Sequence, residues 1–156
     1  MTFESTQTVE KLGGPRVTQF SIFLKNRVGA LLEVVRLLNE STVHVLAVSV
    51  QDSADTAIVR IVVSDPESVQ KVFHERNVPF SVCELVVVEL KEGATELGRL
   101  LAALLAAECN IFGSYALLTR PRGRPALALH VEDNECAASV LQGQQFRILS
   151  QSDISR

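Results

Sequence analysis

A glycine turn between an apolar strand and an amphipathic helix is the stretch of this sequence best suited to chemistry. It reads Lys25-Asn26-Arg27-Val28-Gly29-Ala30-Leu31. Gly29 permits a positive φ and lets another molecule approach the backbone closely. The amides that follow it are unpaired at a helix N-terminus and favour a carboxylate. The turn therefore predicts a cradle for a small anion, although a strand-to-helix turn also accommodates a glycine for purely structural reasons.

The histidines, cysteines and carboxylates form no catalytic or metal-binding pattern. No histidine has a carboxylate or cysteine at ligand spacing, and the histidines are His44, His74 and His130. The three cysteines are too widely spaced for a disulfide framework and suit a reducing cytoplasm: Cys83, Cys109 and Cys136. No two carboxylates have a spacing that requires acid–base chemistry. We therefore expect no metal, no cofactor and no enzymatic activity.

The composition excludes two classes of partner. The 156 residues carry a net charge of -3, and the richest arginine cluster is the run 120–125, RPRGRP. We interpret this run as a solvated hairpin tip, with an anion or protein contact as the alternative. No apolar run approaches the roughly 20 residues of a membrane span, and residues 1–16 lack the apolar segment of a secretion signal. We expect a cytoplasmic protein with a polar, flexible leader at 1–16 that binds neither nucleic acid nor membrane.

The elements that position the glycine turn follow from the hydrophobic periodicity. Apolar residues alternate before the turn, and after it they recur at helical spacing from Leu31 to Leu38. A hairpin follows, and then Asp65 and Pro66 mark the start of a second helix. The remaining predicted strands of this half are 43–50, 57–63 and a strand from Phe80 onward. The predicted order is β-α-β-β-α-β.

The second half of the chain repeats that order. A helical stripe opens it, formed by Leu97, Leu100, Leu101, Leu104 and Leu105. Strands at 110–119, 126–131 and 146–149 and a helix at 135–141 follow. Leu31 corresponds to Leu97 and Asp65 to Asp133, a separation of about 67 residues. The chain is therefore predicted to be an internal duplication.

Each copy should fold as one four-stranded antiparallel sheet with both helices on one face, the ferredoxin-like arrangement of the α+β class. Right-handed crossovers give the strand order 4-1-3-2. The segment 80–90 must supply the last strand of the first copy and the first strand of the second, because two strands need about ten residues. We therefore expect two rigidly joined domains, at 17–84 and 85–156, with no flexible linker.

The pattern from Val17 to Ile154 resembles two tandem ACT domains, small-molecule regulatory modules of amino-acid metabolism. The segment SIFLKNRVGALLEVVRLLNE is similar to the strand-loop-helix signature of the family, and VRIVVSDP resembles its third strand leading into the second helix. The arrangement is most similar to small stand-alone tandem ACT proteins of bacteria that have no catalytic domain.

The resemblance implies a non-catalytic regulatory protein that binds a free amino acid or a similar small metabolite. The ligand would lie near the first strand-helix loop at a domain or dimer interface, in a homodimer. The implied binding residues are Asn26, Arg27, Val28, Gly29, Ala30, Leu31 and His44. The corresponding second loop is Gly93, Ala94, Thr95, Glu96 and Leu97. Since Thr95 stands at the glycine position, that turn is remodelled or its site is degenerate. The alternative is a regulatory subunit that docks on a biosynthetic enzyme without binding an amino acid itself.

Overall fold

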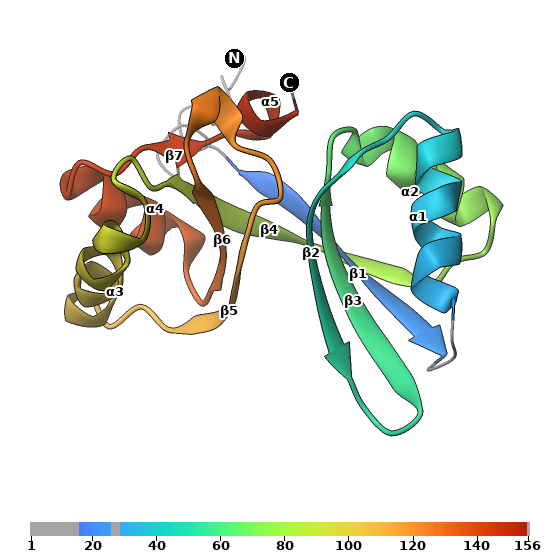
Figure 1. Ribbon diagram of the computed structural model, residues 1–156. Helices are drawn as coiled ribbons and strands as arrows, with labels where there is room; N and C mark the ends of the chain where they lie inside the picture. The colour runs from blue at the N-terminus through green and yellow to red at the C-terminus, as the bar shows by residue number, and fades with distance from the viewer. Residues whose placement is uncertain (1–15, 26–28, 156) are drawn as a thin grey trace, which may run out of the picture.

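Seven strands join in one curled antiparallel sheet in the computed structural model, which describes residues 16–25 and 29–155 (Figure 1). The main path of the sheet is β2-β3-β1-β4-β6-β5, and β7 pairs with β4. The predicted leader therefore lies outside the described residues except for Arg16. The elements in chain order are β1 Val17–Lys25, α1 Ala30–Glu40, β2 Val45–Asp52, β3 Thr56–Val63, α2 Pro66–Glu75, β4 Phe80–Glu89, the 3₁₀ helix η1 Gly93–Glu96, α3 Leu97–Ala106, β5 Ile111–Ala116, the 3₁₀ helix η2 Pro121–Gly123, β6 Ala126–Val131, α4 Asn134–Gly143, β7 Ile148–Leu149 and α5 Gln151–Ile154.

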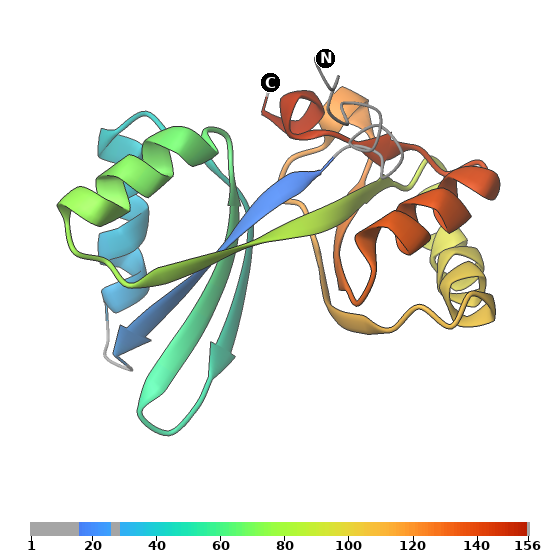
Figure 2. The ribbon, with the colours of Figure 1, turned by 180° about the vertical axis from the view of Figure 1, so that it is seen from behind.

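Strand β4 belongs to both halves of the sheet. Its residues from Phe80 to Leu85 pair with β1, and those from Val86 to Glu89 pair with β6. Each half thus has the predicted strand order 4-1-3-2, with β4 as the last strand of one half and the first of the other. Figure 2 shows β4 running from one half into the other without a linker. The predicted α+β fold, two tandem ferredoxin-like units, is confirmed, and the boundary between 84 and 85 stays a prediction that falls inside β4.

The duplication is visible in the backbone as well as in the order of elements. Asp65 and Asp133 cap α2 and α4 in the same way, since each carboxylate accepts a hydrogen bond from the backbone N–H three residues later, at 3.2 and 3.0 Å. Four residues with positive φ follow the helices in matched pairs: Thr42 and Glu108 after α1 and α3, and Asn77 and Gln145 after α2 and α4. Equivalent caps and equivalent left-handed residues are expected of one small fold present twice.

Three apolar cores hold the molecule together. One lies between the first half of the sheet and helices α1 and α2, and includes Phe20 and Phe73. Another lies between the second half and helices α3 and α4, and includes Leu104 and Val86. The third fills the space between the two sheet faces that helices do not cover, and it includes Val87. Because successive strand residues point to opposite faces, β4 supplies side chains to both the helix core and the core between the sheets.

The curl of the sheet brings its two edge strands together. The backbone N–H of Leu118, just after β5, donates to the carbonyl of Leu46 in β2 at 2.7 Å. The short helix α5 also bridges the halves, because the Gln151 amide accepts from the Thr18 N–H at 3.1 Å and donates to the Val63 carbonyl at 2.9 Å. The two ferredoxin-like units are therefore joined by a strand, a core and these bridges. No helix in the described part of the chain is long and apolar enough to cross a membrane.

The predicted leucine stripe of α3 is only partly buried. Leu100 and Leu104 are 0% and 1% exposed. Leu97, Leu101 and Leu105 are 39%, 43% and 79% exposed. A helix on the outside of a sheet presents only one side to the core. The other three leucines, spaced four residues apart, form a stripe beside the buried side of the helix and are partly exposed.

Candidate functional site

A groove of about 430 Å³ lies directly beside the glycine turn. Its walls come from the end of β1, the first turns of α1 and the loop between α2 and β4. Lys25 and Glu33 supply one positive and one negative charge, and Asn77 supplies an amide. The apolar wall consists of Phe23, Leu24, Val34, Leu37, Val78 and Pro79. An apolar hollow of this size with a few polar groups is typical of a small-molecule site.

Gly29 has the backbone conformation that the sequence predicts. Its φ of 87° and ψ of -8° lie in the left-handed region, which side chains with a Cβ disfavour. An added Cβ would meet nothing within 4 Å, so the glycine is required by its conformation rather than by close packing. Its carbonyl accepts the first hydrogen bond of α1, from the Glu33 N–H at 2.9 Å. The glycine thus turns the chain sharply at the mouth of the groove.

The N-terminus of α1 differs from those of α2 and α4. Those two helices have aspartate caps, whereas no side-chain cap is found for α1 among the described residues. The first-turn amides from Ala30 to Leu32 therefore have no described side-chain acceptor. Helix N-terminal amides carry partial positive charge and favour an anion. In the groove wall, Lys25 adds a positive charge and Glu33 a negative one.

The structure places the predicted site residues in different positions. Gly29 and Ala30 adjoin the groove, and Leu31 is half-buried against the first core. The three preceding residues, Asn26, Arg27 and Val28, lie outside the described residues.

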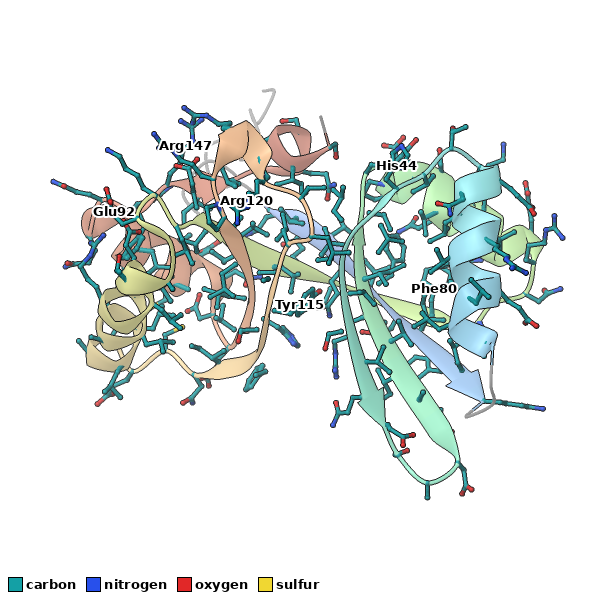
Figure 3. All side chains as sticks on the ribbon, in the orientation of Figure 1. His44, Phe80, Glu92, Tyr115, Arg120 and Arg147 are labelled. Carbon is teal, nitrogen blue, oxygen red and sulfur yellow. The ribbon has the colours of Figure 1, made fainter. Side chains whose placement is uncertain are left out.

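His44 does not join this group. It lies beyond the opposite end of α1, and the 11 residues of that helix span about 16 Å. Its backbone N–H donates to the Ser64 hydroxyl at 2.9 Å, and the side chain is exposed in the upper part of Figure 3. The helix α1 therefore separates His44 from the glycine turn, and a role for His44 in binding stays a prediction.

The second-copy loop is remodelled, one of the two outcomes left open by its sequence. Gly93 has φ of 69° and begins a 3₁₀ helix that runs into α3. The Glu96 carboxylate accepts from the Glu92 N–H at 3.2 Å, and the Thr95 hydroxyl donates to the Glu92 carbonyl at 2.9 Å. The polar groups of this loop therefore bond to one another, whereas no described side chain caps the helix that follows Gly29.

Sequence reasoning missed the loop Asn77-Val78-Pro79 as part of the groove. The Pro79 carbonyl accepts from the Phe23 N–H at 3.3 Å, next to the antiparallel pair of Ile22 and Phe80. The predicted strand order contained the signal, because it makes β4 a neighbour of β1. The start of β4 must then lie beside the end of β1, where the glycine turn begins.

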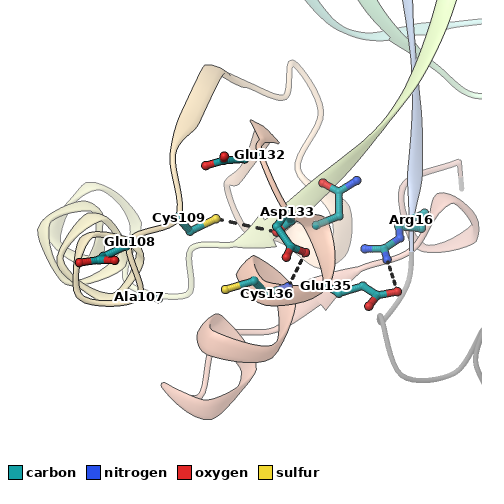
Figure 4. Close-up of a pocket in the computed structure, with 9 residues that line it drawn as sticks. Arg16, Ala107, Glu108, Cys109, Glu132, Asp133, Glu135 and Cys136 are labelled. Atoms are coloured by element: carbon teal, nitrogen blue, oxygen red, sulfur yellow. Dashed lines mark hydrogen bonds and ion pairs between the residues drawn. The ribbon is translucent and has the colours of Figure 1, made fainter.

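A second hollow, of about 610 Å³, lies in the other half of the molecule and has a different chemistry (Figure 4). Arg16 forms ion pairs with Glu84 and Glu135 at 3.3 and 3.7 Å. The Cys109 thiol donates to the Asp133 carbonyl at 3.8 Å, and burial raises its pKa, so it is not an activated nucleophile. Four carboxylates line this hollow: Glu108, Glu132, Asp133 and Glu135. It is therefore poorly suited to hold the carboxylate of a ligand.

A smaller cleft, of about 280 Å³, lies where the two sheet faces meet. Tyr115 lines it and donates its hydroxyl to Gln19 Oε1 at 2.7 Å. Burial raises the pKa of Tyr115 well above its usual value. Tyr115 is thus a tethered residue of the interface between the halves. Among the described residues, no group of three or more histidine, cysteine, aspartate or glutamate side chains is arranged to hold a metal ion.

The fold and the groove define the class of protein. It consists of two ferredoxin-like units that share one strand, with a ligand-sized hollow at the opening strand-helix turn. The chain belongs to the ACT domain pair family, whose model matches residues 16–156.

Solved structures show the same fold. The chain is similar to a protein from Bacteroides thetaiotaomicron with 23% identity and a TM-score of 0.83, covering 92% of this chain and 99% of that one. It is also similar to the ligand-free regulatory subunit of aspartate kinase from Thermus thermophilus with 12% identity and a TM-score of 0.56, covering 84% and 91%. A comparison with curated protein sequences found no match.

Proposed function

We propose that this protein is a non-catalytic regulatory protein that binds a free amino acid in the groove beside Gly29. The observation that carries the proposal is the N-terminus of α1, where no described side chain caps the helix and which opens beside a hollow of about 430 Å³. Membership of the ACT domain pair family supports a regulatory role. The aspartate kinase regulatory subunit of similar fold is consistent with that class.

The groove offers a place for each part of an amino acid. The ligand carboxylate would accept hydrogen bonds from the first-turn amides of α1 and lie near Lys25. The ammonium would face backbone carbonyls at the end of β1, with Glu33 contributing negative charge. An apolar side chain would contact Leu37 and Pro79. The groove therefore favours an amino acid with an apolar side chain.

All groove residues come from the first half of the chain. The interface at which the ligand is expected to act is therefore one with a second copy rather than one between the two halves. A ligand that binds one arrangement of the subunits better than another shifts the population toward that arrangement, which is all that regulation requires. In this proposal, amino-acid binding tightens a homodimer.

Thermal unfolding against a panel of the twenty amino acids tests the proposal. A ligand at 100 times its dissociation constant adds about 2.7 kcal/mol to the free energy of unfolding. For a chain of this length we expect that to raise the melting temperature by roughly 5–10 °C. Isothermal titration of the stabilising amino acid should then give one site per chain.

Lys25→Gln is the variant that locates the site, and Lys71→Gln is its matched control. Both lysines are exposed, but Lys71 lies on α2 and does not line the groove. We expect Lys25→Gln to weaken amino-acid binding and Lys71→Gln to leave it unchanged. A panel in which no amino acid raises the melting temperature would contradict the proposal, as would equal affinities in the two variants.

The alternative function, docking on a biosynthetic enzyme without binding an amino acid, also has an observation in its favour. The α3 stripe, formed by Leu97, Leu101 and Leu105, is exposed. Apolar residues four apart on one side of a helix are typical of a helix that packs against another protein. Such a surface would serve a regulatory subunit whose signal depends on contact alone.

Leu101→Glu and Ala106→Glu separate this alternative from the proposal. Both positions are exposed on α3, but Ala106 lies outside the leucine stripe. If the stripe is a docking surface, Leu101→Glu alone should abolish co-purification of the enzyme partner. Retention of that partner by Leu101→Glu, together with a positive amino-acid panel, would favour the groove as the functional site.

A further inference from the structure

Three arginines converge on a hollow that lies apart from the Gly29 groove. Arg120 and Arg122 belong to the hairpin tip around η2, whereas Arg147 immediately precedes β7. The hollow has a volume of about 420 Å³, and we call it the arginine pocket. Figure 3 shows Arg120 and Arg147 on the same side of the second half, reached from separate segments of the chain.

The fourth arginine of this region shows what a structural role looks like. Arg124 forms an ion pair with Glu89 at 3.3 Å, and Glu89 is only 4% exposed. Arg120, Arg122 and Arg147, by contrast, line the pocket with exposed side chains. The interpretation of the run 120–125 as a solvated tip thus fails for Arg124, which pairs with a buried carboxylate.

The described lining of the pocket carries more positive than negative charge. Against the three arginines stands Asp153, whose carboxylate accepts from the Ser150 N–H at 2.8 Å. Guanidinium groups that line one hollow repel one another, and an anion that lies between them relieves that repulsion. A cavity lined by charges of one sign also raises the local concentration of the opposite ion. The overall charge of the chain is -3, so the positive charge here is local.

The number of guanidinium groups indicates the kind of anion. A guanidinium presents a planar fork of N–H donors that matches the oxygens of a carboxylate or phosphate. A phosphoryl group has three terminal oxygens and can accept from three arginines at once, whereas a carboxylate has two. Pro121 and Ile154 also line the hollow and are buried, so they form an apolar floor that offers little surface of its own to the organic portion of a ligand.

We propose that the arginine pocket binds a small organic phosphate monoester through its phosphoryl group. Arg120, Arg122 and Arg147 bind the phosphoryl oxygens, and the organic part lies over Pro121 and Ile154. The pocket includes two residues of α5, and Gln151 of that helix bonds to Thr18 and Val63 in the first half. The ligand would therefore bind where the two halves are joined. The proposal does not depend on amino-acid binding at Gly29.

Isothermal titration of the full chain with phenyl phosphate, inorganic phosphate and succinate tests the proposal at constant ionic strength. We expect phenyl phosphate to bind saturably at one site per chain, inorganic phosphate to bind more weakly and succinate to bind least. Arg120→Gln and Arg147→Gln should each raise the dissociation constant for phenyl phosphate about 10- to 100-fold, because each removes charged hydrogen bonds.

Arg36→Gln is the matched control, since Arg36 is exposed on α1 and does not line the pocket. It should leave the dissociation constant unchanged, and far-UV circular dichroism should show all three variants folded. Equal affinity of Arg147→Gln and the unmodified chain would overturn the proposal. Binding of succinate but not of phenyl phosphate would also overturn it. So would a dissociation constant for phenyl phosphate that Arg36→Gln raises as much as Arg147→Gln does.

Discussion

Tyr115→Phe tests how the facing sheets hold the two halves together. The Tyr115 hydroxyl on β5 donates to Gln19 Oε1 on β1 at 2.7 Å, and Gln19 is 1% exposed. Phenylalanine keeps the ring and its packing. It removes the one donor that the described residues offer to this oxygen, so the substitution leaves a buried acceptor without a partner.

The expected loss follows from that unpaired oxygen. A buried polar atom left without its hydrogen bond costs about 1–3 kcal/mol, more than the net value of an ordinary hydrogen bond. With a urea m-value of about 2 kcal/mol/M, the unfolding midpoint should fall by about 0.5–1.5 M. The m-value itself should not change, because the surface exposed on unfolding is the same.

Urea unfolding followed by far-UV circular dichroism measures this midpoint, with Ser114→Ala as the control. Ser114 is an exposed neighbour on the same strand. The double variant Gln19→Leu/Tyr115→Phe should recover part of the loss, since it removes the acceptor as well as the donor. An unchanged midpoint for Tyr115→Phe would refute the reasoning, because it would mean that the halves are not held through this buried bond.

Three further predictions concern titration, a buried charge and the core. Because the pKa of Tyr115 is raised, the unfolded chain loses its tyrosine proton near the usual pKa of 10.0 while the folded chain keeps it. The free energy of unfolding should therefore fall as pH rises above that value. In the folded chain, the tyrosinate absorbance of this single tyrosine should appear only at higher pH. Arg124→Ala should lower the free energy of unfolding by about 2 kcal/mol in chemical denaturation, because it leaves the Glu89 carboxylate buried and unpaired. The side chain of Arg124 is itself 40% exposed. A loss no larger than that of Arg36→Ala would contradict this prediction. Leu104→Ala should cost about 2–5 kcal/mol in the same assay, whereas Leu105→Ala, one residue further along α3, should change it by less than about 0.5 kcal/mol; similar losses at both positions would show that the exposed stripe is covered.

The element order and the duplication could be predicted from the sequence because they depend on local patterns. Buried side chains recur with the period of a strand or a helix, and Asp65 and Asp133 signal the starts of α2 and α4 by themselves. The shared strand β4 could be predicted because the repeated order required two strands from one segment, and that segment was just long enough for both. Gly29 could be predicted as left-handed because glycine tolerates that conformation best.

The sequence by itself determined which residues are apolar, where helices and strands begin, and that one fold occurs twice. The tertiary structure decided which apolar sides are covered and which distant residues meet. It left Leu101 exposed, placed His44 a helix length from Gly29, and brought Arg147 beside Arg120. Periodicity records how side chains repeat along one element, whereas contacts between elements depend on strand pairing and on the curl of the sheet, which no local pattern contains.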